Sequence, residues 1–255
     1  MIELWQFRAS PYNEKARWAL DLKGVPHSRR SLLPGPHAAA IHAKTGQTAT
    51  PILKLDGVWV TGSAAIVEAL EARFPTPPLL PEDPTLRADA LAIQQRFDEE
   101  LGPRMRRATF GALLRAPIYL ARVFAAGRST LTQMAYGALI PAVSGLIRAA
   151  NGITGPNSIT DGERAIEEAL AFIDARRGER RYLIGETFTV ADMSAAAFIA
   201  MVVDFSGTPM AKPKPVPRAV RAWLARYADH PTAVWAREIY AKHRGRADDF
   251  DGAPS

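Results

Sequence analysis

The chain has 255 residues, of which 47% are hydrophobic and 23% charged. These proportions are typical of a globular protein with one large domain or two smaller ones. The net charge of +6 comes from 32 basic residues scattered among 26 acidic ones, and no nucleic-acid-binding motif accompanies them, so we expect no nucleic-acid partner. The chain has no cysteine, which excludes disulfides, thiolate-bound metals and a protein thiol as nucleophile.

Residues 2–7 alternate apolar and polar side chains, which predicts a β-strand. The next motif is Ser10-Pro11-Tyr12. Ser10 offers an N-cap hydroxyl, and proline fits the first turn of a helix. We expect this helix to run to about Lys23 and a second strand to cover residues 27–32. Two strands joined by a helix predict a parallel, right-handed βαβ unit.

The first helix has small and apolar residues on one side, among them Ala16, Ala19 and Leu20. That side is predicted to face the core. Lys15 and Arg17 are expected on the outside.

A short helix is expected over residues 37–44 and a turn over 45–50. Strands are then predicted at 52–55 and 58–61, joined by Asp56-Gly57, a dipeptide that favours a two-residue hairpin. Ser63 is predicted to cap a third helix, in which apolar residues recur at helical spacing. The expected order is therefore βαβ, helix, ββα.

Five prolines lie between Pro75 and Pro84, which predicts a linker over residues 76–84. Residues 1–75 form the expected α/β domain. Residues 85–245 are predicted to be helical throughout, with a central buried helix over residues 191–203, and residues 246–255 form an expected tail. The five histidines show no metal-ligand spacing, so we expect no metal. Residues 1–5 lack the pattern of a secretory signal, so a cytoplasmic location is expected.

Residues 131–147 are uncharged and mostly apolar, with Pro141 inside the stretch. Seventeen residues is the lower limit for crossing a bilayer. A buried helical hairpin, or a lid over an apolar pocket, is the favoured interpretation; membrane contact is the alternative.

A βαβ-ββα domain, a proline-rich linker and an all-helical second domain resemble a glutathione transferase. The motifs in the chain that are similar to this family are Ser10-Pro11-Tyr12, Thr50-Pro51, Gly62-Ser63 and Phe188-Thr189-Val190-Ala191-Asp192. The resemblance implies a thioredoxin-like first domain and a helical second domain that holds the second substrate. In the last motif, Thr189 and Asp192 have the spacing of a capping box.

The resemblance also implies a glutathione site. The α-carboxylate of the γ-glutamyl group would lie at Gly62 and Ser63, where the amides of a helix N-terminus favour an anion. Thr50 would pair with the cysteinyl backbone beside a cis Pro51. Gln47 would contact the glycyl end, although a plain loop amide explains this residue as well. Gly62 departs from the family, which usually has an acidic residue or glutamine here.

Ser10 is the candidate catalytic residue, donating a hydrogen bond to the glutathione sulfur. Lowering a thiol pKa from about 8.5 to about 6.5 requires about 2.7 kcal/mol. A hydrogen bond to a charged group supplies about 1.5–3 kcal/mol, and a helix N-terminus about 0.3–1 more. Two alternatives remain at this point: Ser10 is only the helix cap, or Tyr12 contacts the thiol.

These expectations lead to an enzyme that activates glutathione, its co-substrate, for attack on a hydrophobic electrophile, with peroxidase or ether-cleaving chemistry as variants. The runner-up is a non-catalytic ligand-binding or membrane-associated protein on the same fold. The resemblance further implies a homodimer. The sequence does not identify the second substrate.

Overall fold

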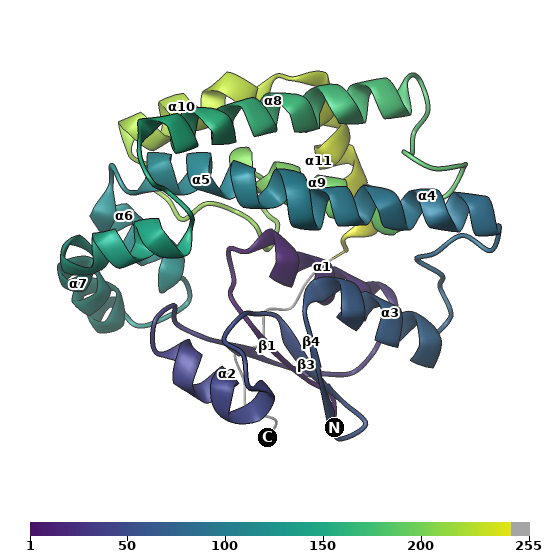
Figure 1. Cartoon of the computed structure of the whole chain (residues 1–255), viewed down its shortest axis with the longest axis horizontal. Helices are drawn as coiled ribbons and strands as arrows, with labels where there is room; N and C mark the ends of the chain where they lie inside the picture. The colour runs from purple at the N-terminus through teal and green to yellow at the C-terminus, as the bar shows by residue number, and fades with distance from the viewer. Residues whose placement is uncertain (246–255) are drawn as a thin grey trace.

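The computed structural model describes residues 1–245; the predicted tail, 246–255, lies outside the described residues. The N-terminal part contains a small sheet and its helices (Figure 1). Its elements are β1 (Glu3–Gln6), α1 (Pro11–Leu22), β2 (Ser28–Ser31), α2 (His37–Thr45), β3 (Ile52–Leu55), β4 (Val58–Thr61) and α3 (Ser63–Arg73).

The four strands lie in the order β2-β1-β3-β4. β1 and β2 are parallel, as the βαβ prediction requires, and the remaining pairs are antiparallel. Asp56 and Gly57 join β3 to β4 with φ angles of 48° and 87°. Two consecutive positive φ angles give the turn whose twist matches a β-hairpin. The predicted α/β thioredoxin-like topology is confirmed.

The C-terminal part is helical and lies over one face of the first part (Figure 1). Its first two α-helices, α4 and α5, are joined directly by a π-helix, with no loop between them. The elements are α4 (Pro84–Gln95), the π-helix η1 (Arg96–Leu101), α5 (Gly102–Leu113), α6 (Pro117–Phe124), α7 (Thr130–Ala150), α8 (Pro156–Arg177), α9 (Val190–Val202), α10 (Arg218–Ala228) and α11 (Pro231–His243).

Helix α9 is the predicted central helix, and every one of its residues is buried. The predicted capping box is present at its start. The Asp192 carboxylate accepts from the backbone N–H of Thr189 at 2.9 Å and from that of Leu183 at 2.8 Å. One side chain therefore satisfies two buried donors, which would otherwise be costly to bury.

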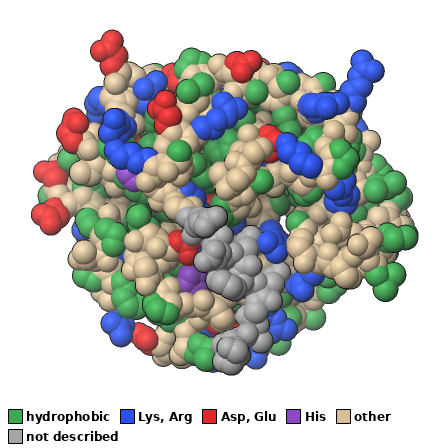
Figure 2. All heavy atoms as spheres, turned by 180° about the vertical axis from the view of Figure 1, so that it is seen from behind, with side chains coloured by type: hydrophobic (Ala, Val, Ile, Leu, Met, Phe, Trp, Pro, Cys, Tyr) green, Lys and Arg blue, Asp and Glu red, His purple; other side chains and the backbone are tan. Residues whose placement is uncertain are grey.

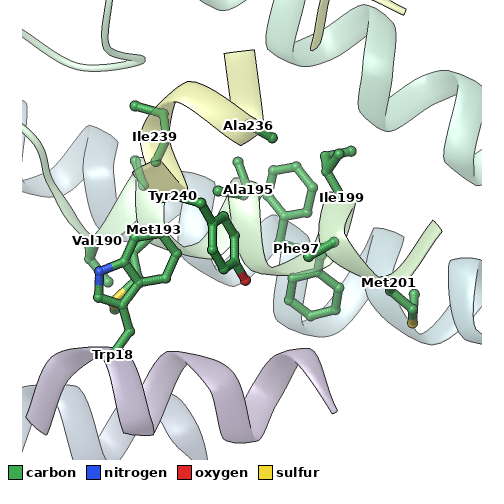
Figure 3. Close-up of a cluster of buried hydrophobic side chains, with 14 of the residues drawn as sticks. Trp18, Phe97, Val190, Met193, Ala195, Ile199, Met201, Ala236, Ile239 and Tyr240 are labelled. Atoms are coloured by element: carbon green, nitrogen blue, oxygen red, sulfur yellow. The ribbon is translucent and has the colours of Figure 1, made fainter. Parts of the chain in front are cut away.

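One hydrophobic core joins the two parts of the chain. Trp18 of α1 packs against Tyr240 of α11, with ring centroids 4.6 Å apart. Figure 3 shows Trp18 pointing from α1 toward Tyr240 and Met193. The helical part thus fixes the position of α1, the helix that follows Ser10.

The prediction that Lys15 and Arg17 lie on the outside of α1 is wrong: both are fully buried. Helix α1 packs against α3 on one side and α9 on another, so it has no solvent-facing side. Lys15 Nζ lies 2.6 Å from Asp98 Oδ2, and Arg17 Nε lies 2.7 Å from Glu14 Oε2. Buried charges persist when they are paired in this way.

The prediction of a buried helical hairpin over residues 131–147 is also wrong. One continuous helix, α7, covers these residues with Pro141 inside it, and Ile140 is its only buried residue. Helix α7 packs against α6, which precedes this stretch. In residues 1–245, α7 alone is long and apolar enough to cross a membrane by length and composition. The apolar face that the sequence assigned to the interior is on the surface.

Candidate functional site

The strand register brings three separate sequence motifs to one edge of the sheet. Trp5 pairs with Ile52, and Ile52 pairs with Thr61. β1 therefore ends where β3 begins and where β4 ends. The segments that follow β1, precede β3 and follow β4 meet at this edge, and they contain Ser10, Thr50-Pro51 and Gly62-Ser63.

Ser10 occupies the N-cap position of α1 in an extended conformation. Its carbonyl accepts the Glu14 N–H at 2.9 Å, but its side chain makes no capping hydrogen bond. The residue is half-buried. The helix therefore does not use the Ser10 hydroxyl, which speaks against a role as a helix cap only.

The Thr50–Pro51 peptide is cis, as the family resemblance implied. The Pro51 carbonyl accepts the Gly62 N–H at 3.0 Å, which ties the β3 and β4 ends of the site together. Sequence reasoning missed Asn13, whose Nδ2 donates to Thr50 Oγ1 at 3.2 Å and whose Oδ1 accepts the Phe7 N–H at 3.1 Å. The signal was an amide in the first turn of a helix, beside the Ser10 motif. Asn13 links the loop before α1 to Thr50.

Ser63 was predicted to cap α3, and the structure corrects this. Gly62 is the N-cap residue, with a φ of 87° that favours glycine, and Ser63 is the first helical residue. No side chain caps α3, and Ser63 is buried. The first-turn amides of α3 and the Ser63 hydroxyl therefore form an arrangement suited to a carboxylate.

The alternative hydroxyl, Tyr12, is committed elsewhere. Its Oη donates to the Asp98 carbonyl at 2.7 Å, and its ring packs edge-on against Phe198. Burial, reinforced by the Asp98 charge, raises the pKa of Tyr12. These contacts attach Tyr12 to the helical part, so of the two candidate hydroxyls in the Ser10-Pro11-Tyr12 motif only that of Tyr12 has a partner there.

Gln47 is placed in the loop before Thr50, and its side chain folds back on that loop. Its Nε2 donates to the Ala49 carbonyl at 3.1 Å, and its Oε1 accepts the Ala49 N–H. This is the loop-amide role that the sequence left open. A contact between Gln47 and a ligand would require the side chain to exchange these bonds.

A cavity of about 400 Å³ opens at Arg8 and Ala9, directly before Ser10 in the chain. Its walls come from the loop after β1, from α5 to α7, from the loop after α9 and from α10. Its basic lining residues are Arg8, Arg122, Lys212 and Lys214, and its large apolar ones include Leu113, Val123, Met201, Met210, Trp223 and Leu224.

Lys212 is a basic residue of the cavity lining whose ammonium group is buried. Burial lowers the pKa of its ammonium to about 8, against the opposing effect of Asp204. Its Nζ donates to the carbonyls of Ala200 at 2.7 Å and Val203 at 3.2 Å. Sequence reasoning missed this basic pocket because its residues come from segments more than eighty positions apart.

Residues 1–245 contain no cluster of three or more His, Cys, Asp or Glu side chains able to hold a metal ion. The chemistry available at the site is that of hydroxyls, amides and basic side chains, beside a partly apolar cavity.

Two family models match this chain. The model described as "Glutathione S-transferase, N-terminal domain" matches residues 4–78, and "Glutathione S-transferase, C-terminal domain" matches residues 156–226. A curated relative, a maleylpyruvate isomerase from Ralstonia sp., is 29% identical over 194 residues, which cover 75% of this chain and 77% of the relative.

Solved structures share the fold. A beta-etherase from Sphingobium sp. strain SYK-6 superposes with a TM-score of 0.62 at 20% identity, covering 93% of this chain and 98% of the other. A theta-class glutathione S-transferase from Xanthomonas axonopodis pv. citri, solved with glutathione bound, gives 0.58 at 22% identity, covering 96% and 98%.

Proposed function

The chain belongs to the glutathione S-transferase family, and from that premise we propose that it binds glutathione and activates its thiol for attack on an electrophile. The observation behind the proposal is the meeting of Ser10, the cis Thr50–Pro51 peptide and the α3 N-terminus at one sheet edge, with the Ser10 hydroxyl not used by its helix. Glutathione has a thiol, a peptide backbone and carboxylates that match these three features.

In the proposed reaction, the Ser10 hydroxyl donates to the sulfur and stabilises the thiolate, and the thiol proton passes to solvent. The thiolate attacks an electrophilic carbon of the second substrate. A carbon–sulfur bond forms while a leaving group departs with its electron pair, or while the electron pair of an alkene takes up a proton. The cavity beside Ala9 is the proposed place for this second substrate.

A second candidate is glutathione-dependent isomerisation of a carboxylate-bearing alkene. Two observations favour it: the relative named maleylpyruvate isomerase, and the basic residues Arg8, Arg122, Lys212 and Lys214 around the cavity. The thiolate would add to the double bond, the resulting single bond would rotate, and elimination would restore both the double bond and glutathione. A cavity with several cations suits an anionic substrate better than a purely apolar one.

We also propose that the protein acts as a homodimer. Gly62 provides no side chain for the glutathione amino group, and a residue of a partner subunit would supply that contact. The alternative hypothesis is a protein of the same fold that binds ligands without catalysing a reaction, and the experiments below test it.

The main test compares Ser10→Ala with Ser63→Ala. Calorimetry measures glutathione binding, ultraviolet difference absorbance measures the bound thiolate, and conjugation of dinitrochlorobenzene measures turnover. We expect Ser10→Ala to retain binding but lose roughly 10- to 100-fold in kcat, because one hydrogen bond to a charged sulfur is lost. We expect Ser63→Ala to raise the KM for glutathione with little change in kcat.

Tyr12→Phe serves as the control, since its hydroxyl contacts Asp98 and we expect an unchanged thiolate signal. If the wild-type protein takes up no glutathione at millimolar concentration, the proposal is wrong. If it binds glutathione without forming a thiolate near neutral pH, the protein is a binding protein and not a transferase.

A further inference from the structure

Helix α7 exposes mainly apolar side chains, whereas an ordinary surface helix exposes polar ones and buries its apolar side. The exposed residues before its last turn include Leu131, Met134, Leu139 and Leu146, and the side chains of Leu131 and Leu146 are 77% and 72% exposed. The polar residues Thr132, Gln133, Tyr136 and Ser144 lie on the half-buried side. The exposed apolar positions of α7 are Leu131, Met134, Ala135, Ala138, Leu139, Pro141, Ala142, Gly145, Leu146, Ala149 and Ala150, and Thr130 and Arg148 at the two ends are exposed as well.

The neighbouring surface of α6 continues this apolar face, since Ile118 is 70% exposed. Figure 2 shows hydrophobic side chains gathered at the edge of the molecule formed by α6 and α7, on the right in that view, with basic side chains beside them and no acidic one. We call the exposed residues of α6 and α7 together the α6–α7 face.

The segment of the chain that forms the α6–α7 face carries charge of one sign. From residue 101 to residue 160 the sequence contains no aspartate or glutamate, and it contains seven arginines, at 104, 106, 107, 115, 122, 128 and 148. Arg104 and Arg107 pair with Asp161 of α8. Arg115, Arg128 and Arg148 are exposed at the ends of α6 and α7.

We propose that the α6–α7 face docks the protein on an anionic lipid bilayer. The exposed leucines and Met134 would enter the boundary between headgroups and acyl chains, and the flanking arginines would contact anionic headgroups. Apolar area combined with basic residues is what holds an amphipathic helix in a membrane interface. The lipid is recognised by its negative charge and its accessible acyl layer.

The contacts of α7 favour a helix lying in the interface over one that crosses the bilayer. Tyr136 Oη donates to the Pro34 carbonyl at 2.8 Å, and Ile140 is buried in a cluster with residues of α6. Crossing the bilayer would break these contacts and place Thr132, Gln133 and Ser144 in hydrocarbon. In the interface, the polar side of α7 keeps its partners and only the exposed side meets lipid.

The charges also favour lipid over a second copy of this chain as the occupant. A two-fold symmetric interface joins the same patch of both subunits. Here it would bring the arginines of one copy toward those of the other, with no acidic residue in either segment to compensate. An anionic surface, in contrast, gains from every arginine that approaches it.

The absence of cysteine from the sequence allows a direct experiment with the full chain. Leu139→Cys is labelled with an environment-sensitive fluorophore, and Leu91→Cys on α4, a leucine of similar exposure, is the matched control. Both are titrated with vesicles of phosphatidylcholine plus phosphatidylglycerol and with vesicles of phosphatidylcholine alone. We expect a blue shift for Leu139→Cys with the anionic vesicles only, and none for Leu91→Cys.

Flotation with unlabelled protein measures the size of the effect. Leu139→Gln/Leu146→Gln should weaken binding to anionic vesicles roughly 100-fold or more, because two leucine side chains no longer enter lipid. Arg115→Gln/Arg148→Gln should weaken this binding roughly 25-fold, because two cations no longer approach the anionic surface. High salt should also weaken binding of the wild-type protein, because it screens the same attraction. Leu91→Gln and Arg87→Gln on α4 should leave it unchanged.

Three results would overturn the proposal. The first is wild-type protein that does not float with anionic vesicles. The second is binding that survives Leu139→Gln/Leu146→Gln. The third is a change of oligomeric state in that variant, measured by light scattering, which would assign the α6–α7 face to a second copy. The glutathione-binding measurements are independent of all three.

Discussion

Helices α1 and α7 depart from the usual surface pattern in opposite directions. α1 buries four polar or charged residues, Asn13, Glu14, Lys15 and Arg17, whereas α7 exposes leucines and buries one residue. In α1, every buried charge has an oppositely charged partner within 2.7 Å. In α7, no described part of the chain covers the apolar side. Ion pairing therefore explains the buried charges of α1. Docking on a lipid bilayer is our proposed explanation for the exposed apolar side of α7.

The largest expected effect is at Glu14, which is fully buried between Arg17 and Arg244. Arg17 Nη2 and Arg244 Nε both lie 2.6 Å from its carboxylate. Glu14→Gln should cost about 3–5 kcal/mol of unfolding free energy, because Arg17 loses its counter-charge in the core. Arg244 loses one of its two acidic partners and keeps Asp21, whose Oδ2 lies 2.8 Å from its Nη1. Urea unfolding at pH 7 measures this, and Glu163→Gln, which affects a surface pair with Arg226, should cost less than about 1 kcal/mol.

The stabilities of wild type and Glu14→Gln can also be compared as a function of pH. Burial alone would raise the pKa of the Glu14 carboxyl, but Arg17 and Arg244 outweigh burial and lower it. The native state therefore binds fewer protons than the unfolded state, so the stabilisation is present above the unfolded pKa of about 4.5 and is lost as the pH falls. The difference between wild type and Glu14→Gln should shrink on acidification; a constant difference would contradict this account.

A smaller loss is expected at the contact between α1 and the helical part. Lys15 Nζ donates to both carboxylate oxygens of Asp98, at 2.7 and 2.6 Å. Asp98→Asn should cost about 2–3 kcal/mol, less than Glu14→Gln, because Asp98 is partly exposed and only one cation loses its partner. Thermal unfolding should show a decrease of roughly 4–12 °C for a chain of this size. An unchanged transition would contradict a stabilising contribution from the ion pair between Lys15 and Asp98.

The cavity beside Ala9 offers a kinetic test. Burial lowers the pKa of Lys212 to about 8, so this residue loses its charge above that pH. The KM for a chloronitrobenzoate should rise roughly tenfold between about pH 7 and pH 9, as one cation near the carboxylate is lost. Uncharged dinitrochlorobenzene should show no such rise, and Lys212→Arg should abolish it. A rise shared by both substrates would place the titrating group elsewhere.

The smallest effect is expected on the exposed side of α7. Leu146→Ala should change the unfolding free energy by less than about 0.5 kcal/mol, because the side chain buries little surface in the free protein. Ile140→Ala, six residues away in the same helix and 2% exposed, should cost about 2–4 kcal/mol. Equal losses for the two variants would show that the outer face is covered in solution.

Much of the fold followed from local patterns. The Asp56-Gly57 turn, the βαβ unit and the Thr189–Asp192 capping box each depend on neighbouring residues, and each was predicted correctly. The buried α9 was predicted because it is apolar on all sides. The errors concerned burial: Lys15 and Arg17 were assigned to the surface, and α7 was assigned to the interior. Hydropathy alone does not show which segments pack against a helix.

Some residues of the candidate site could be identified from the sequence, and others only from the structure. Ser10, Thr50, Pro51 and Ser63 lie in short motifs that resemble those of the family, so they could be proposed without coordinates, and their roles stay predictions. Asn13 and Lys212 could not be found in this way. Their relevance comes from contacts with residues far along the chain or from a pocket assembled out of several segments.

The sequence by itself determined the strands of the sheet, the Asp56-Gly57 turn, the starts of α1 and α9, and the family motifs, because these depend on residues a few positions apart. Only the tertiary structure decided which charges of α1 would be buried, which basic side chains would surround one cavity, and that the apolar side of α7 would face outward. Those features depend on contacts between distant segments, and no local pattern encodes them.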